Sequence, residues 1–277
     1  MMKLTSTPVP IVHALTIAGS DSSAGAGIQA DLKTFAALGA YGCSAITAVT
    51  AQNTLGVRAV HPIPGDVIEA QCDAVFADVR IDVVKVGMLT NVASVGAVIN
   101  VLQRWQPEFV VLDPVLSATT GQAFLSGEAG VLLVQELLPL VDVVTPNIPE
   151  AARLLGVAEA LDVATMKAQA QALCDLGLKA VLLKGGHLPM TAPAVDCLSR
   201  PGLEPQLFVG PRSAASSTHG TGCTLSSALA VAYAQCDRDL PRAVQQAKDY
   251  VAVAIARSGE LDVGQGEGPL QHFHPWC

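Results

Sequence analysis

The segment 216–227 combines glycines, hydroxyl side chains and a cysteine at a point where a helix is expected to begin. Gly220 and Gly222 come directly before an Ala-rich run, 224–234, in which leucine and alanine recur at three- and four-residue spacing. A glycine turn that opens a helix leaves several backbone N–H groups without intrahelical partners, with the positive end of the helix dipole behind them. The segment therefore predicts a site for an anion, most usefully a phosphate whose charge grows during its transfer.

Cys223 lies at the mouth of this predicted turn. A helix N-terminus stabilises a thiolate, so the pattern predicts a lowered pKa for Cys223 and a role as a base or nucleophile near neutral pH. The negative charge of a bound polyanion would act on that pKa in the opposite direction. A small buried cysteine after an ordinary glycine turn is the alternative, and these residues alone leave both interpretations open.

Short apolar runs rich in β-branched residues alternate with helix-like stretches along the chain. Six runs predict buried strands at 14–18, 44–50, 83–86, 109–112, 141–144 and 180–183. Five stretches predict helices at 28–38, 66–77, 94–105, 128–138 and 163–176, and two segments, 194–198 and 206–209, predict antiparallel strands. Strands that are apolar on both faces and separated by helices predict a single α/β domain over 1–277, with a mostly parallel central sheet, helices on both faces and a flexible start at 1–12.

Polar and glycine residues follow all six predicted strands, at the edge where such sheets bind ligands. Each residue alone has an ordinary alternative: Asp113 and Asn147 could form a turn or a cap, and Lys184 could be solvated. Six such strand ends together predict a binding site at this edge. The residues at these ends are Gly19, Gln52, Gly87, Met88, Asp113, Asn147, Glu150, Lys184, Gly185, Gly186 and His187.

The composition argues against several classes of function. Charged residues make up 14% of the 277 residues, and the net charge is −8. A mildly acidic chain with few basic clusters is not expected to bind nucleic acid or an anionic membrane. The start lacks a signal-type apolar stretch, and the apolar runs are too short to span a bilayer. Seven cysteines without paired metal spacing are typical of reduced thiols, so we expect a cytoplasmic protein.

Taken in order, these segments resemble the hydroxymethylpyrimidine/phosphomethylpyrimidine kinases, the thiamine-pathway branch of the ribokinase-like superfamily. The resemblance covers nearly the whole chain and is carried by 19–21, 25–34, 38–42, 50–54, 85–88, 113–115, 145–147, 150–151, 183–187 and 218–223. It implies a ribokinase-like three-layer sandwich that acts as a homodimer. It also implies that MgATP phosphorylates the 5-hydroxymethyl group of 4-amino-5-hydroxymethyl-2-methylpyrimidine, and that the resulting phosphate is phosphorylated again to the pyrophosphate.

The resemblance implies a role in ring binding for four residues. Gln52 would recognise the aminopyrimidine edge, since an amide offers both a donor and an acceptor. Asp31 would accept a hydrogen bond from the exocyclic amine. Gly19 and Met88 would provide a close backbone approach and an apolar wall for the ring.

The resemblance also implies the residues that handle phosphate. Gly220, Gly222 and Cys223 would hold the γ-phosphoryl oxygens, and Cys223 would take the proton of the alcohol. The nucleotide would contact Asn147, Lys184, Gly185, Gly186 and Thr221. Lys184 would lie along the triphosphate and also count as catalytic. Asp113 and Glu150 would organise Mg²⁺ directly or through water, because Mg²⁺ retains waters and prefers carboxylates.

The sequence departs from the family pattern in two places. The family's first loop usually has proline and glycine where this chain has Ser22 and Ala24, and Ala24 would be strained by about 1 kcal/mol or more if its φ were positive. The stretch 116–121 resembles the family's flap only loosely and is the expected mobile cover of the phosphate. His219, next to the anion turn, is expected to pack against the backbone rather than to catalyse.

Three interpretations of function stay open at this point. The first is the pyrimidine kinase, and the second is a pyridoxal or pyridoxine kinase of the same fold. Gln52 favours the first, since a vitamin B6 ring lacks the aminopyrimidine edge. The third is a catalytically silent ligand-binding homologue, against which Cys223, Lys184 and Glu150 argue. A dinucleotide enzyme built on Gly25-Ala26-Gly27 does not fit, because Ala30 stands where its fingerprint requires glycine.

Overall fold

A nine-stranded sheet runs through the part of the chain that the computed structural model describes, residues 10–115, 127–188, 193–213 and 217–277. Its order is β3-β2-β1-β4-β5-β6-β7-β8-β9. Six neighbouring strands of this order are parallel: β2, β1, β4, β5, β6 and β7. The other three, β3, β8 and β9, pair antiparallel with their neighbours. The bounds are β1 His13–Asp21, β2 Tyr41–Asn53, β3 Gly56–Pro62, β4 Val83–Val86, β5 Val110–Leu112, β6 Val143–Val144, β7 Val181–Lys184, β8 Ala194–Ser199 and β9 Gln206–Gly210.

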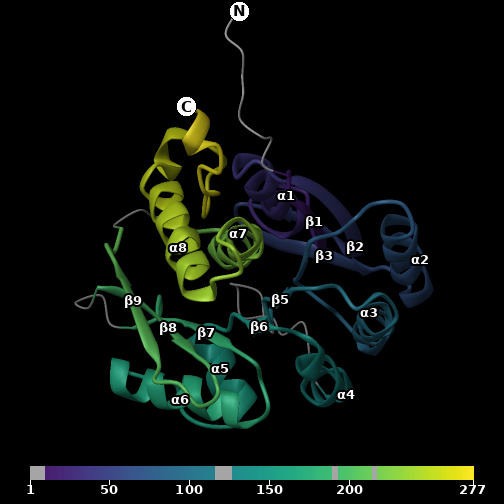
Figure 1. Cartoon of the computed structure of the whole chain (residues 1–277). Helices are drawn as coiled ribbons and strands as arrows, with labels where there is room; N and C mark the ends of the chain where they lie inside the picture. Colours follow the sequence, from purple (N-terminus) through teal and green to yellow (C-terminus); the bar gives the residue numbers. More distant parts are fainter. Residues whose placement is uncertain (1–9, 116–126, 189–192, 214–216) are drawn as a thin grey trace, which may run out of the picture.

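Helices cover both faces of the sheet and complete three layers (Figure 1). One face carries α1 Gly27–Ala37, α7 Thr221–Gln235 and α8 Leu240–Ala256. The other face carries α2 Gly65–Phe76, α3 Val92–Trp105, α4 Glu128–Leu132, α5 Ile148–Leu155 and α6 Val163–Asp175. A π turn, Leu133–Leu137, and a 3-10 turn, Leu138–Leu140, continue α4, and two more 3-10 turns lie at Ser258–Glu260 and His274–Trp276.

Two hydrophobic cores result from the alternation of side chains along the buried strands. In β4, Val84 and Val86 join the core under α2–α6, whereas Val83 joins the core under α1, α7 and α8. Successive strand residues point to opposite faces, so a strand covered on both sides must be apolar at nearly every position. Lys85 is the exception, since it is fully buried on the α7 side.

The strands and helices predicted from the sequence are confirmed in place, with shifted ends. The anion-site helix begins at Thr221 rather than at Thr224, which puts Cys223 inside its first turn. The prediction at 128–138 is confirmed only in part, because the π and 3-10 turns break the regular helix there.

Sequence periodicity missed three elements: β3, α5 and α8. β3 is a largely exposed edge strand without an apolar run, and α5 is only eight residues long and begins beside a proline. α8 has a clear apolar face, but it follows α7 directly, whereas the predicted alternation places a strand after each helix.

The two ends of the described chain pack against the body. Of the predicted flexible start, residues 1–9 lie outside the described residues, but Val12 is buried and its carbonyl accepts from Tyr41 N–H. At the other end, Thr224 Oγ1 lies 3.0 Å from His272 Nε2, and Trp276 Nε1 donates to the Ala37 carbonyl.

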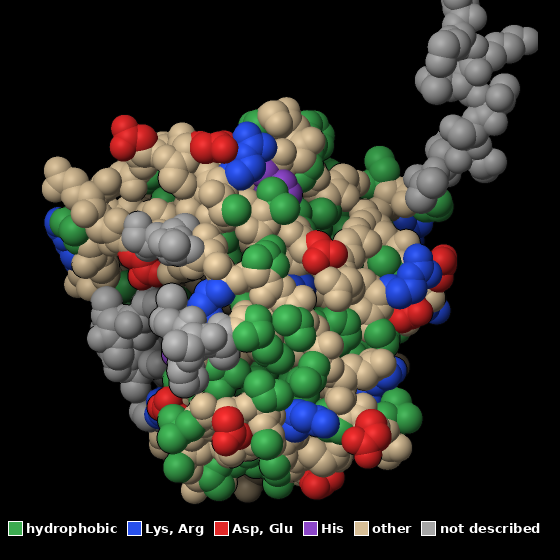
Figure 2. All heavy atoms as spheres, turned by 90° about the vertical axis from the view of Figure 1, so that its left-hand side faces the viewer, with side chains coloured by type: hydrophobic (Ala, Val, Ile, Leu, Met, Phe, Trp, Pro, Cys, Tyr) green, Lys and Arg blue, Asp and Glu red, His purple; other side chains and the backbone are tan. Residues whose placement is uncertain are grey.

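The outer strand β9 forms one edge of the sheet, on the side of the molecule shown in Figure 2. Hydrophobic side chains gather near the middle of this view, with single acidic and basic side chains around them. Leu207 and Val209 of β9 are exposed. Among the described residues, none of the helices is both long enough and apolar enough to cross a membrane.

Candidate active site

A cleft of about 850 Å³ opens at the carboxyl ends of the parallel strands. β2 and β4 lie on opposite sides of β1 in the sheet, so the strand order reverses its direction at β1. Ligands in α/β sheets bind at such a topological switch point. All six predicted strand ends contribute to the cleft. The predicted site residues that line it are Gly19, Gln52, Met88, Asp113, Asn147, Glu150, Lys184, Gly186, Gly220, Thr221, Gly222 and Cys223.

The first turn of α7 forms one end of the cleft, which we call the phosphate end together with Lys184, Asp113, Asn147 and Glu150. Gly220 is the N-cap, with a φ of +83°. A Cβ at this position would lie 1.8 Å from the Gly25 carbonyl oxygen, so only glycine lets the first loop lie against the turn. The N–H groups of Gly222 and Cys223 have no partner elsewhere in the described chain, whereas Thr221 N–H donates to the Thr218 carbonyl.

An ion pair between Lys184 and Asp113 lies against this turn, with 2.8 Å between Nζ and Oδ1. A Cβ on Gly222 would lie 3.2 Å from both Lys184 Nζ and Asp113 Oδ2. Burial alone would lower the pKa of Lys184, but the carboxylates of Asp113 and Glu150 outweigh it and raise that pKa. Lys184 is therefore a cation at the point where a phosphate would meet the N-terminus of α7.

Asn147 and Glu150 form a reciprocal capping box at the start of α5. The Asn147 side chain accepts from Glu150 N–H at 2.8 Å, and the Glu150 carboxylate accepts from Asn147 N–H at 2.7 Å. The capping role that the sequence left open for Asn147 is thus present, and both residues also line the cleft. Within the described residues no group of three His, Cys, Asp or Glu side chains is arranged to hold a metal ion. Asp113 and Glu150 fit Mg²⁺ all the same, because this ion commonly takes one or two carboxylates together with phosphate oxygens and water.

The thiol of Cys223 differs from the sequence prediction. Burial raises the pKa of Cys223 to about 11, and the opposing effect of the nearby Lys85 ammonium does not cancel it. The prediction of a lowered pKa is wrong, because burial and the nearby carboxylates of Asp31 and Asp113 disfavour the thiolate more than the Lys85 ammonium favours it. Cys223 is therefore a thiol at neutral pH.

A second part of the cleft, which we call the ring end, consists of Gly19, Gln52 and Met88, together with the Asp21 and His219 side chains that support Gln52. A Cβ on Gly19 would lie 2.3 Å from Met88 Cε, so the thioether rests on the backbone of β1. The carbonyl of Met88 accepts from Thr47 Oγ1 at 2.6 Å, which holds the segment after β4 against β2. Gly19 and Met88 thus provide a flat apolar wall.

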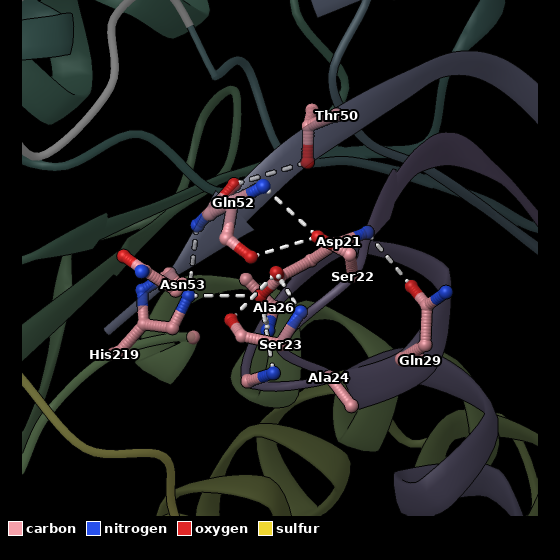
Figure 3. A network of polar contacts seen from close by, with 12 residues as sticks. Asp21, Ser22, Ser23, Ala24, Ala26, Gln29, Thr50, Gln52, Asn53 and His219 are labelled. Carbon is pink, nitrogen blue, oxygen red and sulfur yellow. Dashed lines mark hydrogen bonds and ion pairs between the residues drawn. The ribbon is translucent and has the colours of Figure 1, made fainter. Parts of the chain in front are cut away.

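Gln52 projects from the end of β2 into a polar network at the ring end (Figure 3). Its amide nitrogen is placed 3.1 Å from His219 Nε2 and its amide oxygen 3.3 Å from Thr50 Oγ1. His219 Nε2 also lies 2.9 Å from Asp21 Oδ2. The side chain in the position predicted to recognise the ring is therefore supported by a histidine and a carboxylate.

Comparisons with known proteins agree with this geometry. The family model described as phosphomethylpyrimidine kinase matches residues 21–271. The chain belongs to this family. It is 50% identical over 265 residues to the hydroxymethylpyrimidine/phosphomethylpyrimidine kinase of Escherichia coli K12, covering 96% of this chain and 98% of that protein.

Two solved structures show the same ribokinase-like fold. A phosphomethylpyrimidine kinase from Clostridium difficile 630 matches with a TM-score of 0.76 and 41% identity, covering 88% of this chain and 99% of that one. An ADP complex of Bacillus subtilis pyridoxal kinase matches with a TM-score of 0.85 and 34% identity, covering 95% and 98%. Family membership makes this chain a phosphotransferase, and the predicted three-layer fold is confirmed.

Two residues predicted for the site, Asp31 and Gly185, are not among those that line the cleft. Asp31 is fully buried; its carboxylate pairs with Lys85 at 2.9 Å and accepts from Thr16 and Ser227 hydroxyls at 2.6 Å each. With its oxygens so engaged, Asp31 does not face a ring in the cleft. A Cβ on Gly185 would lie 2.0 Å from the Val195 carbonyl oxygen, so this glycine allows β7 and β8 to approach.

The first loop carries the strain that the sequence predicted for Ala24, which has a φ of +63°. The flap prediction at 116–121 lies outside the described residues. Sequence reasoning gave no role to Asp21, although it stands inside the quoted loop motif. The signal that would have found it is a carboxylate followed by two glycines, since such a loop directs several N–H groups at one acceptor.

Proposed function

We propose that the chain transfers the γ-phosphoryl group of ATP to the 5-hydroxymethyl group of 4-amino-5-hydroxymethyl-2-methylpyrimidine, and then phosphorylates that product. One observation carries the proposal: a single cleft joins an anion-binding helix terminus with a cation to a neutral amide beside an apolar wall. Phosphoryl transfer requires mainly positioning and charge stabilisation, which the phosphate end offers. The names of the relatives support the same substrate.

At the phosphate end each residue has a distinct task in this proposal. The N–H groups of Gly222 and Cys223 bind the γ-phosphoryl oxygens, and Lys184 lies along the triphosphate. Asp113 and Glu150 would hold Mg²⁺, which supplies positive charge at the β- and γ-oxygens when bound. Because Lys184 already pairs with Asp113, a bound nucleotide would compete for that cation and release the carboxylate toward the metal.

Cys223 receives the proton of the attacking alcohol. Since burial raises its pKa to about 11, only a small fraction of Cys223 is thiolate at neutral pH. The small thiolate fraction limits the first transfer at neutral pH, so the rate of that step should rise with pH. In the second phosphorylation the acceptor is an ionised phosphate that carries no alcohol proton, and Cys223 matters less there.

A pyridoxal kinase is the second candidate, favoured by the higher TM-score to the Bacillus subtilis pyridoxal kinase. The phosphate end would serve either substrate, so the ring end must decide between them. Gln52 offers a donor and an acceptor side by side, and the aminopyrimidine presents the complementary pair. This complementarity and the higher identity to the phosphomethylpyrimidine kinases favour the pyrimidine.

The test is a direct comparison of substrates. Purified protein is mixed with MgATP and either hydroxymethylpyrimidine or pyridoxal, and products are followed by mass. We expect mono- and diphosphorylated pyrimidine, with kcat/KM well above that for pyridoxal. Pyridoxal phosphate as the main product would overturn the pyrimidine substrate, and no product from either would indicate a ligand-binding homologue. A Lys184→Met protein purified in parallel controls for contaminating kinases. Sedimentation of the same sample tests the homodimer that the resemblance implies.

A further inference from the structure

His219 lies between the carboxylate of Asp21, which can only accept hydrogen bonds, and the side-chain amide of Gln52, which can donate or accept (Figure 3). Its Nε2 is 2.9 Å from Asp21 Oδ2 and 3.1 Å from the amide of Gln52. The histidine side chain is 12% exposed and that of Asp21 is 4% exposed, so water cannot easily replace either contact. The protonation of Nε2 therefore decides what the amide of Gln52 can do.

Asp21 is surrounded by donors alone. Its Oδ1 accepts from the N–H and hydroxyl of Ser23 at 2.8 and 2.7 Å, and its Oδ2 accepts from Gly25 and Ala26 N–H at 3.1 and 2.8 Å. Such a carboxyl is ionised; burial by itself would raise the pKa of Asp21, but these bonds and the one to His219 hold it at about 2. An ionised oxygen 2.9 Å away requires that His219 Nε2 carries a proton and donates it.

A protonated Nε2 cannot accept from an amide N–H, so the carbonyl of Gln52 must face His219. The other end of the amide gives the same answer independently. Thr50 Oγ1 donates its only proton to the Ser20 carbonyl at 2.9 Å and so presents a lone pair to the amide, which an NH₂ group satisfies and a carbonyl does not. Exchanging the two ends of the Gln52 amide changes no atomic position. The carbonyl then shares the single Nε2 proton of His219 with Asp21 Oδ2, and the NH₂ group donates to Thr50 Oγ1.

We propose that Asp21 and His219 are positioning residues that hold the Gln52 carbonyl toward His219 and its NH₂ group toward Thr50. The inference rests on the proposed function, since it concerns how the ring is recognised. With these bonds made, the carbonyl keeps one lone pair and the NH₂ group one proton for the ligand. They form a directional pair for a ring that presents an amine next to a ring nitrogen, and a vitamin B6 ring lacks that pair.

The ring of His219 is itself held in place by the first loop. A Cβ on Gly25 would lie 2.4 Å from His219 Cδ2 and 3.3 Å from Pro269 Cβ, so the glycine makes room for the imidazole. The backbone N–H of His219 donates to the Gly268 carbonyl. A histidine fixed on both sides can orient the amide, but the same contacts would also be expected if His219 only tied the loop to α7. The experiment must separate these two roles.

Two variants of His219 test the orientation of the amide. His219→Phe keeps a flat ring but removes the N–H, whereas His219→Gln returns an amide N–H at about the reach of Nε2. The readouts are kcat and KM for hydroxymethylpyrimidine and for pyridoxal, with the melting temperature of each protein. We expect His219→Phe to lower the pyrimidine-to-pyridoxal selectivity about 10-fold through KM, because the amide loses its fixed direction. His219→Gln should recover most of that selectivity.

Thr50→Val provides a second route, since it removes the partner at the other end of the amide with little change in shape. We expect a smaller loss of selectivity in the same direction. In a double-mutant cycle with Gln52→Leu, neither His219→Phe nor Thr50→Val should reduce selectivity further. Losses that are equal for both substrates, or that add to Gln52→Leu, would show that His219 only stabilises the loop and would overturn the inference. Wild-type protein that does not turn over the pyrimidine would instead refute the proposed function.

Discussion

The two ends of the cleft present chemically different groups. The phosphate end uses charge: the cation of Lys184, the carboxylates of Asp113 and Glu150, and the N-terminus of α7. The ring end presents a neutral amide, and its one ionised group, Asp21, is turned toward the loop and His219. Charge can bind the nucleotide phosphates, which are the same for every acceptor substrate. The direction of hydrogen bonds can distinguish between similar acceptor rings.

Both ends are built from contacts between segments that are far apart in the chain. At the phosphate end, the ion pair of Lys184 and Asp113 joins residues 71 positions apart, and Gly220 lies against Gly25. At the ring end, the decisive contact joins Asp21 to His219, which are 198 positions apart. Under the proposed function every acceptor uses the same nucleotide, so changes at the phosphate end should affect all substrates alike, and changes at the ring end should separate them.

The largest expected effect is that of Cys223→Ala at the phosphate end. Loss of the base should lower kcat for the first phosphorylation by roughly 10²- to 10⁴-fold, equally for the pyrimidine and for pyridoxal. The second phosphorylation should suffer less. In the unaltered protein, the first step should accelerate as pH rises toward 11, because the raised pKa of Cys223 keeps it a thiol below that range.

Steady-state and single-turnover kinetics from pH 6 to 10 would measure these effects. Cys43→Ala is the matched control, since Cys43 is half-buried and lies outside the residues that line the cleft. A loss confined to one substrate would contradict the division between the two ends. Equal losses in both phosphorylations would refute the role of Cys223 as the acceptor of the alcohol proton.

A smaller effect is expected from Asp21→Asn, and it concerns the free energy of unfolding rather than the rate of catalysis. The folded protein lowers the pKa of Asp21 from 3.8 to about 2, so this carboxylate stabilises the fold above pH 4 and the contribution is lost as pH falls through 4 toward 2. That shift corresponds to roughly 2 kcal/mol.

Urea unfolding of wild type and Asp21→Asn between pH 7 and pH 2.5 would check this. The difference in free energy of unfolding should shrink by most of that amount over the range. Asp78→Asn, at an exposed carboxylate, is the control and should show no such convergence. A pH-independent difference would mean that Asp21 is not the ionised anchor of the ring end.

The smallest effect is expected from Ala24→Gly in the first loop. Its φ of +63° strains alanine but not glycine, so the variant should gain about 0.5–1 kcal/mol after the entropy of the unfolded glycine is counted. The melting temperature should rise by about 1–3 °C with selectivity unchanged. Ala70→Gly, in the middle of α2 on an exposed face, should instead lose about 1 kcal/mol. A rise in both variants, or in neither, would show that the loop is not strained at Ala24.

Local pattern was sufficient for much of the fold and for the phosphate end. A few neighbouring residues are enough to recognise the apolar runs of β4 and β7 and the glycines at the start of α7. Because parallel strands end at one edge, the polar residues after them converge without any further information. The same logic missed β3, whose exposed edge needs no apolar run, and α5, which is too short to show a helical period.

The sequence by itself determined which residue types are present at the strand ends, and it predicted a phosphate site at Gly220. Only the tertiary structure decided which of them face the cleft. Asp31 matched the family motif yet lies buried against Lys85, and His219 looked like a packing residue yet contacts Gln52. Exposure and hydrogen-bond direction depend on groups brought together from distant segments, and burial raised the pKa of Cys223 for the same reason. Such quantities are properties of the assembled site.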